Sequence, residues 1–396
     1  MRTPIRATRA LAALAVLAAY SPARADQFDT LNFRVRHAVL YDSNFFRSSG
    51  INASNPVRSE TRDMTTLGME LDKQYSLQRV ELDASVVANR FRTSDYLNYN
   101  ALNYRAVWHW SLTPRLHGTL RREQDEALNS YDYFGGRARN LRTDQTTAAS
   151  MEAVVGRDWR LLGGLERETR TNEQPIAEQG DYTLRNVSIG VRYLFPSGSS
   201  ISYRLLDGQG TYQNRIPGVT ALPRSFEQLQ HELRFAWAVT GKTTVGARIA
   251  HLSREHPGLA LRDFSGVVGD INAQWAATGK LHFQALASRG LSANQNNTSS
   301  YISNSRLGLS ANWSVRSRTV VYAGFDRTIN DFDGTPPGVV PENREDKIHG
   351  MRLGLRWTPI DALSFGAAVQ RSRRTSTISG ADYTNNSATV DATFRF

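Results

Sequence analysis

Long stretches of this chain alternate apolar and polar residues with a period of two. Successive side chains of a β-strand point to opposite faces, so such stretches predict strands with one apolar and one polar face. The stretch before Trp237 shows the pattern: one face carries Leu229, His231, Leu233 and Phe235, and the other carries Gln230, Glu232 and Arg234. Similar stretches precede Trp110 and Trp357.

Short phrases with a large residue at a fixed place recur at intervals of 35 to 45 residues. Each phrase ends one alternating stretch, makes a tight turn and begins the next, as in WAVTG (237–241) and WTPID (357–361). Aromatic residues beside the turn are typical of strands that leave a membrane at its interface, so the repeat predicts a transmembrane β-barrel. The expected interface anchors are Tyr75, Trp110, Tyr193, Trp237, Trp275, Trp313 and Trp357, with Val155 in the same place.

Longer polar stretches separate these hairpins. The sequence predicts eight tight turns alternating with nine such loops, which gives an up-and-down antiparallel barrel of 18 strands. Because 61–75 and 141–157 are polar or Thr-rich, a barrel of 16 strands stays open. Short periplasmic turns and long extracellular loops are usual in such barrels. The loops are expected near 43–61, 92–99, 123–141, 170–181, 206–225, 253–262, 290–300, 328–346 and 374–382.

A β-propeller is the main competing architecture, because a repeat of about 40 residues also suits a four-stranded blade. A blade needs four short strands with turns between them. Here each repeat holds only two long alternating runs, and the aromatic residue lies beside a turn. The pattern therefore favours the barrel.

The first 25 residues resemble a secretory leader. Three arginines precede the apolar segment LAALAVLAAY (11–20), which is too short to span a bilayer. Ala23-Arg24-Ala25 fits a cleavage site, so the predicted domains are a signal peptide at 1–25 and an outer-membrane barrel at 26–396. A short N-terminal anchor helix is the alternative.

Composition narrows the class further. Removing the leader takes away four arginines and lowers the formal charge from +11 to +7. The surplus is interspersed and no basic run reaches five residues, so a nucleic-acid partner is not expected. The absence of cysteine excludes disulfides and cysteine-bound zinc. No apolar stretch after residue 25 is long enough for a transmembrane helix.

The final nine residues, ATVDATFRF (388–396), form another amphipathic strand that ends in phenylalanine. Such a strand resembles the C-terminal assembly signal of bacterial outer-membrane barrels, with Phe394 and Phe396 as its aromatic residues. The chain is then expected in the outer membrane of a Gram-negative bacterium, in contact with its lipid. Its folding partners would be a Sec-type exporter and the barrel-assembly machinery.

The phrase YDSNFFR (41–47) resembles the D-x-N-x-[FY]-R opening of EpsL-type porin-like barrels, which belong to exosortase and Wzx/Wzy-type exopolysaccharide systems. The residues that carry the resemblance are Asp42, Asn44 and Arg47. It implies an outer-membrane barrel that passes polysaccharide outward, with periplasmic polysaccharide-export proteins as further partners.

No catalytic motif, cofactor loop or metal-ligand pattern stands out, so no enzyme, cofactor or metal is expected. The chain has no G-x-S-x-G elbow and no Walker A loop. Carboxylates two residues apart, such as Glu166 and Glu168, would share the lumen face at about 7 Å, a spacing compatible with glycosidase acids. Neutralisation by arginine on neighbouring strands is the favoured interpretation of these pairs.

The polar faces predict a charged lumen. Acids dominate 61–91, whereas arginines dominate 192–248 and 352–356, so a transverse electric field is expected across the pore. The residues predicted along the solute path are Arg105, Arg192, Arg204, Arg234, Arg248, Arg352, Arg356, Glu70, Asp72, Glu81 and Asp83.

Three functions remain open on sequence grounds. The first is a porin-like channel for exopolysaccharide export. The second is a general or substrate-specific diffusion porin for small polar solutes. The third is an envelope-structural or enzymatic barrel, for which the sequence offers no catalytic set.

Overall fold

The computed structural model describes residues 30–50, 56–132, 136–178, 180–214, 224–293, 301–334 and 343–396. The predicted leader and its cleavage site at Ala25 lie outside the described residues. The described strands are β1 (Leu31–Asp42), β2 (Glu60–Tyr75), β3 (Gln78–Phe91), β4 (Tyr99–Thr113), β5 (Leu116–Leu128), β6 (Leu141–Val155), β7 (Trp159–Asn172), β8 (Tyr182–Leu194), β9 (Ser200–Tyr212), β10 (Ser225–Thr240), β11 (Thr243–Glu255), β12 (Phe264–Ala276), β13 (Leu281–Ala293), β14 (Tyr301–Arg316), β15 (Thr319–Asp333), β16 (Glu345–Ile360), β17 (Leu363–Ser376) and β18 (Tyr383–Arg395).

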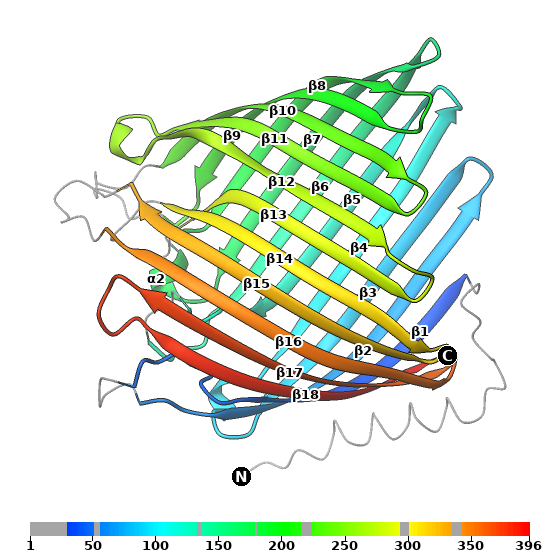
Figure 1. Cartoon of the computed structure of the whole chain (residues 1–396). Helices are drawn as coiled ribbons and strands as arrows, with labels where there is room; N and C mark the ends of the chain where they lie inside the picture. The colour runs from blue at the N-terminus through cyan, green and yellow to red at the C-terminus, as the bar shows by residue number, and fades with distance from the viewer. Residues whose placement is uncertain are drawn as a thin grey trace.

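The strands form one closed antiparallel barrel (Figure 1). Each strand pairs with the strands before and after it in sequence, and β18 pairs with β1 to close the sheet. In the closing pair, Arg34 lies opposite Arg395 and Asp42 lies opposite Ser387. The prediction of an 18-stranded up-and-down barrel is confirmed, and the alternatives of 16 strands and of a propeller are wrong.

The two ends of the barrel differ. Eight short turns lie at one end, hereafter the turn end, and the longer connections lie at the other, the loop end (Figure 1). Residue Phe396 exchanges backbone hydrogen bonds with Phe33, so both ends of the described sheet lie at the turn end. In barrels of this class the turn end faces the periplasm.

The strands reach further toward the loop end than predicted. Residues 123–128, 206–212 and 328–333 continue β5, β9 and β15, although the sequence analysis assigned them to loops. The reason is physical: beyond the membrane both faces of a strand meet water, so polar residues occupy both faces and the alternation fades.

The register separates an outer and an inner face. On β10, Leu229, Leu233 and Trp237 have exposed side chains and share one face, while Glu232 on the opposite face is only 1% exposed. Cross-strand partners share a face, so the outward face continues from Trp237 to Val245 on β11 and from Ile249 to Gly269 on β12. An apolar exposed face is what a lipid environment favours.

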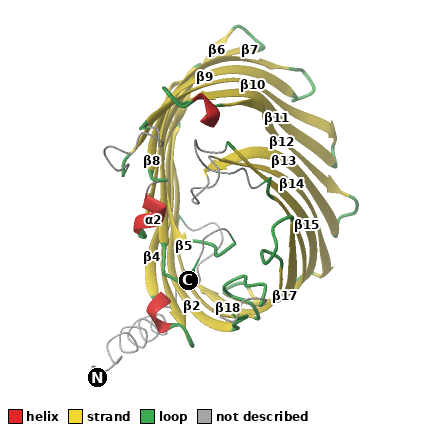
Figure 2. Ribbon diagram, turned by 90° about the vertical axis from the view of Figure 1, so that its left-hand side faces the viewer, coloured by secondary structure: helices red, strands yellow, loops and turns green. Residues whose placement is uncertain are grey.

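Helical structure in the described residues is limited to single turns. They are α2 (Pro175–Glu178), η1 (Asp95–Leu97) and η2 (Ala260–Arg262), all at the loop end. No helix in these ranges is long and apolar enough to cross a membrane. Figure 2 shows the strands surrounding an oval interior, with loop segments inside its outline near β5, β17 and β18.

Candidate solute path through the lumen

Contacts across the interior identify the lumen face. Arg374 of β17 donates from Nη1 to the backbone oxygen of Asp132, which lies in the loop 129–140 between β5 and β6. The loop therefore reaches β17 through the inside of the barrel. Arg374 pairs with Ile348 on β16, and this face continues along β16 to Arg352 and Arg356. The structure thus places both arginines in the lumen.

The predicted acidic residues gather on β2 and β3 near the turn end. We call Glu70, Asp72, Glu81 and Asp83 the acidic arc; Glu70 pairs with Asp83, and Asp72 with Glu81, across the two strands. Arginines on the same strands and their neighbours interrupt the arc. As a result, much of its negative charge is neutralised locally.

The neutralising contacts are short. Arg34 of β1 bonds Glu70 and reaches Asp83 with 2.7 Å between Nη2 and Oδ1. Arg79 Nε lies 2.8 Å from Asp72 Oδ1, and His109 Nε2 lies 3.2 Å from Glu81. Arg105 lies beside Asp83 in register and 3.9 Å from Glu123.

A second charged group lies on β8 to β11, also in the turn half of the barrel. We call Arg192, Arg204, Arg234 and Arg248 the basic arc. Arg192 Nη1 lies 2.7 Å from Glu152, and Arg248 Nε lies 2.7 Å from Asp270. Arg160 lies 3.7 Å from Glu152 and belongs to the same group of charges. Together with the basic arc it makes five arginines beside three carboxylates, which are Glu152, Glu232 and Asp270.

Two members of the basic arc surround one buried acid. Arg234 Nε lies 2.6 Å from Glu232, and Arg248 Nη1 lies 3.7 Å from its other oxygen. Arg204 has no ion pair with any described residue; its Nη2 donates to the hydroxyl of Ser188 at 3.1 Å. The arc therefore carries a positive surplus that local carboxylates do not cancel.

Strand order defines how the two arcs face each other. In an 18-stranded ring the strand nine positions away lies opposite, so β2 and β3 lie opposite β11 and β12. Arg248 on β11 thus lies across the lumen from the acidic arc, as the predicted transverse field requires. Arg352 and Arg356 do not lie opposite the acidic arc, because β16 is only four strands from β2. The prediction that these two arginines face the acidic residues across the lumen is therefore wrong.

A polar cluster holds two loops inside the loop end of the barrel. We call Asp42, Arg47, Asp132, Arg374 and Tyr383 the loop anchor. Arg47 Nη1 lies 3.0 Å from Asp42 and its Nε lies 3.9 Å from Asp132. Tyr383 donates its hydroxyl to Asp132 at 2.6 Å. The guanidinium groups of Arg47 and Arg374 also lie over the Tyr383 ring, at 5.8 and 4.7 Å from its centroid.

Aromatic packing adds to the loop anchor. Phe45 and Phe46 of the loop after β1 contact Tyr131 of the loop 129–140, with ring centroids 5.5 and 4.9 Å apart. They cover Phe91 and Tyr99, which belong to the inner wall and are 4% and 9% exposed. Together the two loops fill part of the lumen beside β1 to β5 and narrow the path there.

The resemblance residues belong to this anchor. Asn44 is 2% exposed; its backbone N–H donates to Asp42, and its side chain donates to the backbone oxygen of Ser48 at 2.8 Å. Residues 41–47 therefore have a structural role: they direct the chain into the lumen where β1 ends. The sequence analysis missed Asp132, Arg374 and Tyr383, because nothing in a single sequence links positions so far apart.

A second inward cluster lies on the opposite wall. The Arg254 guanidinium lies 4.4 Å from the centroid of Phe226, and the His256 ring lies 5.9 Å from it. His256 begins the loop 256–263, and its backbone N–H donates to Asp263 at 2.7 Å. Burial, followed by the positive charge of Arg254, lowers the pKa of His256 to about 4.

The expected interface anchors lie at the turn end of their strands. The outward face of β10, β12, β14 and β16 ends in Trp237, Trp275, Trp313 and Trp357, each about half exposed. Tyr75 is 76% exposed at the end of β2. Trp110 and Tyr193 are half-buried, the first against Gly118 and the second against Trp159 at 5.0 Å. The sequence analysis missed Trp159, which continues this aromatic row.

The C-terminal residues pack against the first strand. The Phe396 ring stacks on Phe33 at 5.8 Å and on Phe394 at 5.5 Å. In the described ranges, no group of three or more His, Cys, Asp or Glu could hold a metal ion. The lumen of the barrel is therefore a charged passage that two inward loops narrow in part.

Comparison with known proteins gives the fold and a partial family match. No curated protein matches the sequence. Two similar solved structures are Pseudomonas aeruginosa OccK1 (OpdK), at 10% identity and a TM-score of 0.50, and OccK2 (OpdF) in complex with glucuronate, at 11% and 0.51. The matches cover 92% and 93% of this chain and 99% and 98% of those chains.

These likenesses show the fold alone, a β-barrel like those of OccK1 and OccK2. The family model matches less than half of the chain. Residues 231–396, which contain β11 to β18 and most of β10, match the family described as "Putative beta-barrel porin 2".

Proposed function

We propose that this barrel is a diffusion channel for small anionic polar solutes, with acid sugars as a fitting class. The observation that carries the proposal is the basic arc, in which Arg204 has no carboxylate partner among the described residues. A positive surplus on a wall of a wet lumen raises the local concentration of anions. The likeness to OccK2, solved with glucuronate, is in keeping with this proposal.

The loop anchor supports selection by size as well as by charge. It fixes two loops inside the barrel beside β1 to β5, on the side of the acidic arc. Solute then passes between these two loops and the wall of β8 to β11, which carries the basic arc nearer the turn end. Eighteen strands without such a filling leave a wide aqueous channel.

Liposome swelling tests this proposal. Glucuronate and glucose have nearly the same size and differ in one carboxylate; with valinomycin present to carry the potassium counter-ion of glucuronate, their relative swelling rates report the effect of charge. Liposomes that contain the protein should swell faster in isotonic glucuronate than in glucose. Equal rates, faster entry of glucose, or no swelling in either sugar would contradict the proposal.

Exopolysaccharide passage is the second candidate, and the resemblance at Asp42, Asn44 and Arg47 favours it. For a polymer to pass, the contacts of the loop anchor must break so that the two loops can leave the lumen. Deletion of the gene followed by an assay of surface polysaccharide tests this function separately. Unchanged surface polymer would remove this candidate and leave the diffusion channel untouched.

A further inference from the structure

Two of the arginines on the lipid-facing wall lie on β13 and β15. Arg289 on β13 lies opposite Ser305, and Arg327 on β15 lies opposite Leu307. Their cross-strand partners belong to the apolar outer face, and both arginines are exposed. Neither forms a hydrogen bond or an ion pair with a residue in the described ranges. In the described part of the chain, neither arginine is therefore neutralised by a direct contact, although Asp331 on the same face lies close enough to Arg289 to interact with it electrostatically.

The height of both arginines is defined by the aromatic row at the turn end. Leu281 and Thr319 are the register partners of Trp313 and Trp357, and the two arginines follow them by eight residues. Eight residues of a strand tilted by about 40° rise roughly 21 Å. The apolar band of such barrels is about 25 Å tall. Arg289 and Arg327 thus lie at its upper border, where lipid headgroups begin.

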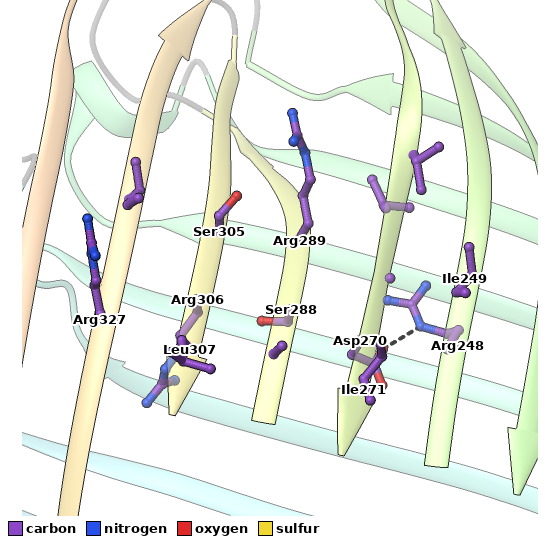
Figure 3. Close-up of a pocket in the computed structure, with 15 residues that line it drawn as sticks. Arg248, Ile249, Asp270, Ile271, Ser288, Arg289, Ser305, Arg306, Leu307 and Arg327 are labelled. Carbon is purple, nitrogen blue, oxygen red and sulfur yellow. Dashed lines mark hydrogen bonds and ion pairs between the residues drawn. The ribbon is translucent and has the colours of Figure 1, made fainter. Parts of the chain in front are cut away.

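A groove with a volume of about 800 Å³ runs beneath these arginines on the outer wall of β11 to β15. Its floor includes Gly269 and Ala287, whose small size leaves the hollow. Figure 3 shows Arg289 and Arg327 extending toward the loop end from the wall that forms the groove. The apolar side chains that border it are Ile249, Val267, Ile271, Leu307 and Ile329.

We propose that this groove binds a phosphorylated glycolipid of the outer leaflet. Its phosphate groups are bound by Arg289 and Arg327, and an acyl chain lies over Gly269 and Ala287. Arginine binds phosphate through parallel charge-assisted hydrogen bonds, and its long stem lets the charged head reach the interface. An acyl chain matches an apolar hollow that opens toward lipid. The proposal does not depend on what the lumen transports.

The neighbouring strands favour an anionic headgroup over a neutral one. Arg373 lies on the same outward face two strands from Arg327, with His349 between them, so a further arginine adds positive charge beside the site. Like charges that lie near one another on one face of a sheet repel each other, and a bound anion offsets that repulsion. The outward acids Asp331 and Glu345 lie further toward the loop end, where Glu345 is paired with Lys347 at 2.6 Å.

Native mass spectrometry of the detergent-purified barrel tests the site. The probes are a diphosphorylated lipid A, the same lipid after removal of both phosphates, and inorganic phosphate. The intact barrel should retain only the first. The double variant Arg289→Gln/Arg327→Gln should bind it about 30-fold more weakly, since each arginine contributes about a factor of five to anionic-lipid binding.

A matched control removes two exposed arginines from the turn end. The variant Arg115→Gln/Arg157→Gln loses the same charge in turns on the opposite membrane side, and its lipid binding should equal that of the unmodified protein. Ala287→Phe fills the groove without changing charge and should also weaken binding. Equal binding of the dephosphorylated lipid, or no loss in either groove variant, would overturn the proposal. So would a dimer whose interface covers the groove.

Discussion

The hydroxyl group of Tyr383 on β18 donates a hydrogen bond of 2.6 Å to the carboxylate of Asp132, a residue 251 positions earlier in the chain. The bond joins a loop that starts at β5 to a strand on another part of the barrel wall. Because Arg47 and Arg374 contact the same Asp132, one residue connects both inward loops to the closing strands.

Replacing Tyr383 with phenylalanine should loosen both loops without removing the ring beneath the arginines. A hydrogen bond to a charged group contributes about 1.5–3 kcal/mol. Amide hydrogen exchange in residues 43–49 should accelerate, and single-channel current should become noisier. Tyr203→Phe is the control, because Tyr203 makes a comparable 2.8 Å bond to His231 on the outer face. Unchanged exchange in the Tyr383 variant would refute the role of the loop anchor.

Acidification should open the loop that begins at His256. The pKa of His256 is lowered to about 4 by burial and by Arg254, whereas an exposed histidine titrates near 6.5. Between these values the open loop binds a proton that the packed loop excludes, so packing is fully stable above pH 6.5 and is lost as the pH falls toward 4.

Hydrogen exchange of residues 256–260 across this pH window measures the effect, after correction for the intrinsic pH dependence of exchange. His256→Asn keeps a polar side chain that does not titrate and should abolish the extra acceleration. A variant that still opens between pH 6.5 and 4 would show that another group controls the loop.

Reversing charge at Arg352 and Arg356 should weaken anion selectivity. Both side chains face the lumen from β16, and Arg356 has no ion-pair partner within the described residues. The double variant Arg352→Glu/Arg356→Glu should lower the anion-to-cation permeability ratio by roughly two- to fivefold at low salt, with less effect at high salt. Lys73→Glu, on the outer face of β2, serves as a control for a charge reversal outside the lumen. An unaltered ratio would remove these two residues from the solute path.

Removal of Phe396 should lower the yield of barrel in the outer membrane. Its ring stacks on Phe33 and Phe394, and its backbone bonds to Phe33 close the turn end of the β1–β18 pair. Loss of an aromatic pair costs about 0.5–1.5 kcal/mol beyond area burial. Quantitative immunoblots of membrane fractions measure the yield, with Leu112→Ala, an exposed turn-end residue, as the control. Undiminished yield would count against an assembly signal at this position.

The fold was predictable because one face of every strand meets lipid. That constraint makes apolar residues recur at every second position, as they do between Leu229 and Trp237. This alternation can be recognised without any knowledge of distant contacts. The ends of β5, β9 and β15 were not predictable, because both of their faces meet water there. The same reasoning from phase assigns Arg234 to the lumen and Arg327 to the lipid face.

The interior of the loop end could not be derived from the pattern. Phe45, Phe46 and Tyr131 lie in loops, where no periodicity states which way a side chain points. Asp42 and Arg47 attracted attention as a family resemblance, but their contact with Tyr383 depends on how the barrel closes. The opposition of the two charged arcs likewise follows only from the number and order of strands.

The reversal potential of the purified barrel in a planar bilayer tests the central claim most directly. Under a tenfold gradient of potassium chloride, the basic arc predicts that chloride permeates faster than potassium, and this preference sets the sign of the reversal potential. The magnitude of the reversal potential should fall as the overall salt concentration rises. A potential of the opposite sign, or a protein that inserts without conducting, would contradict an anion-selective channel.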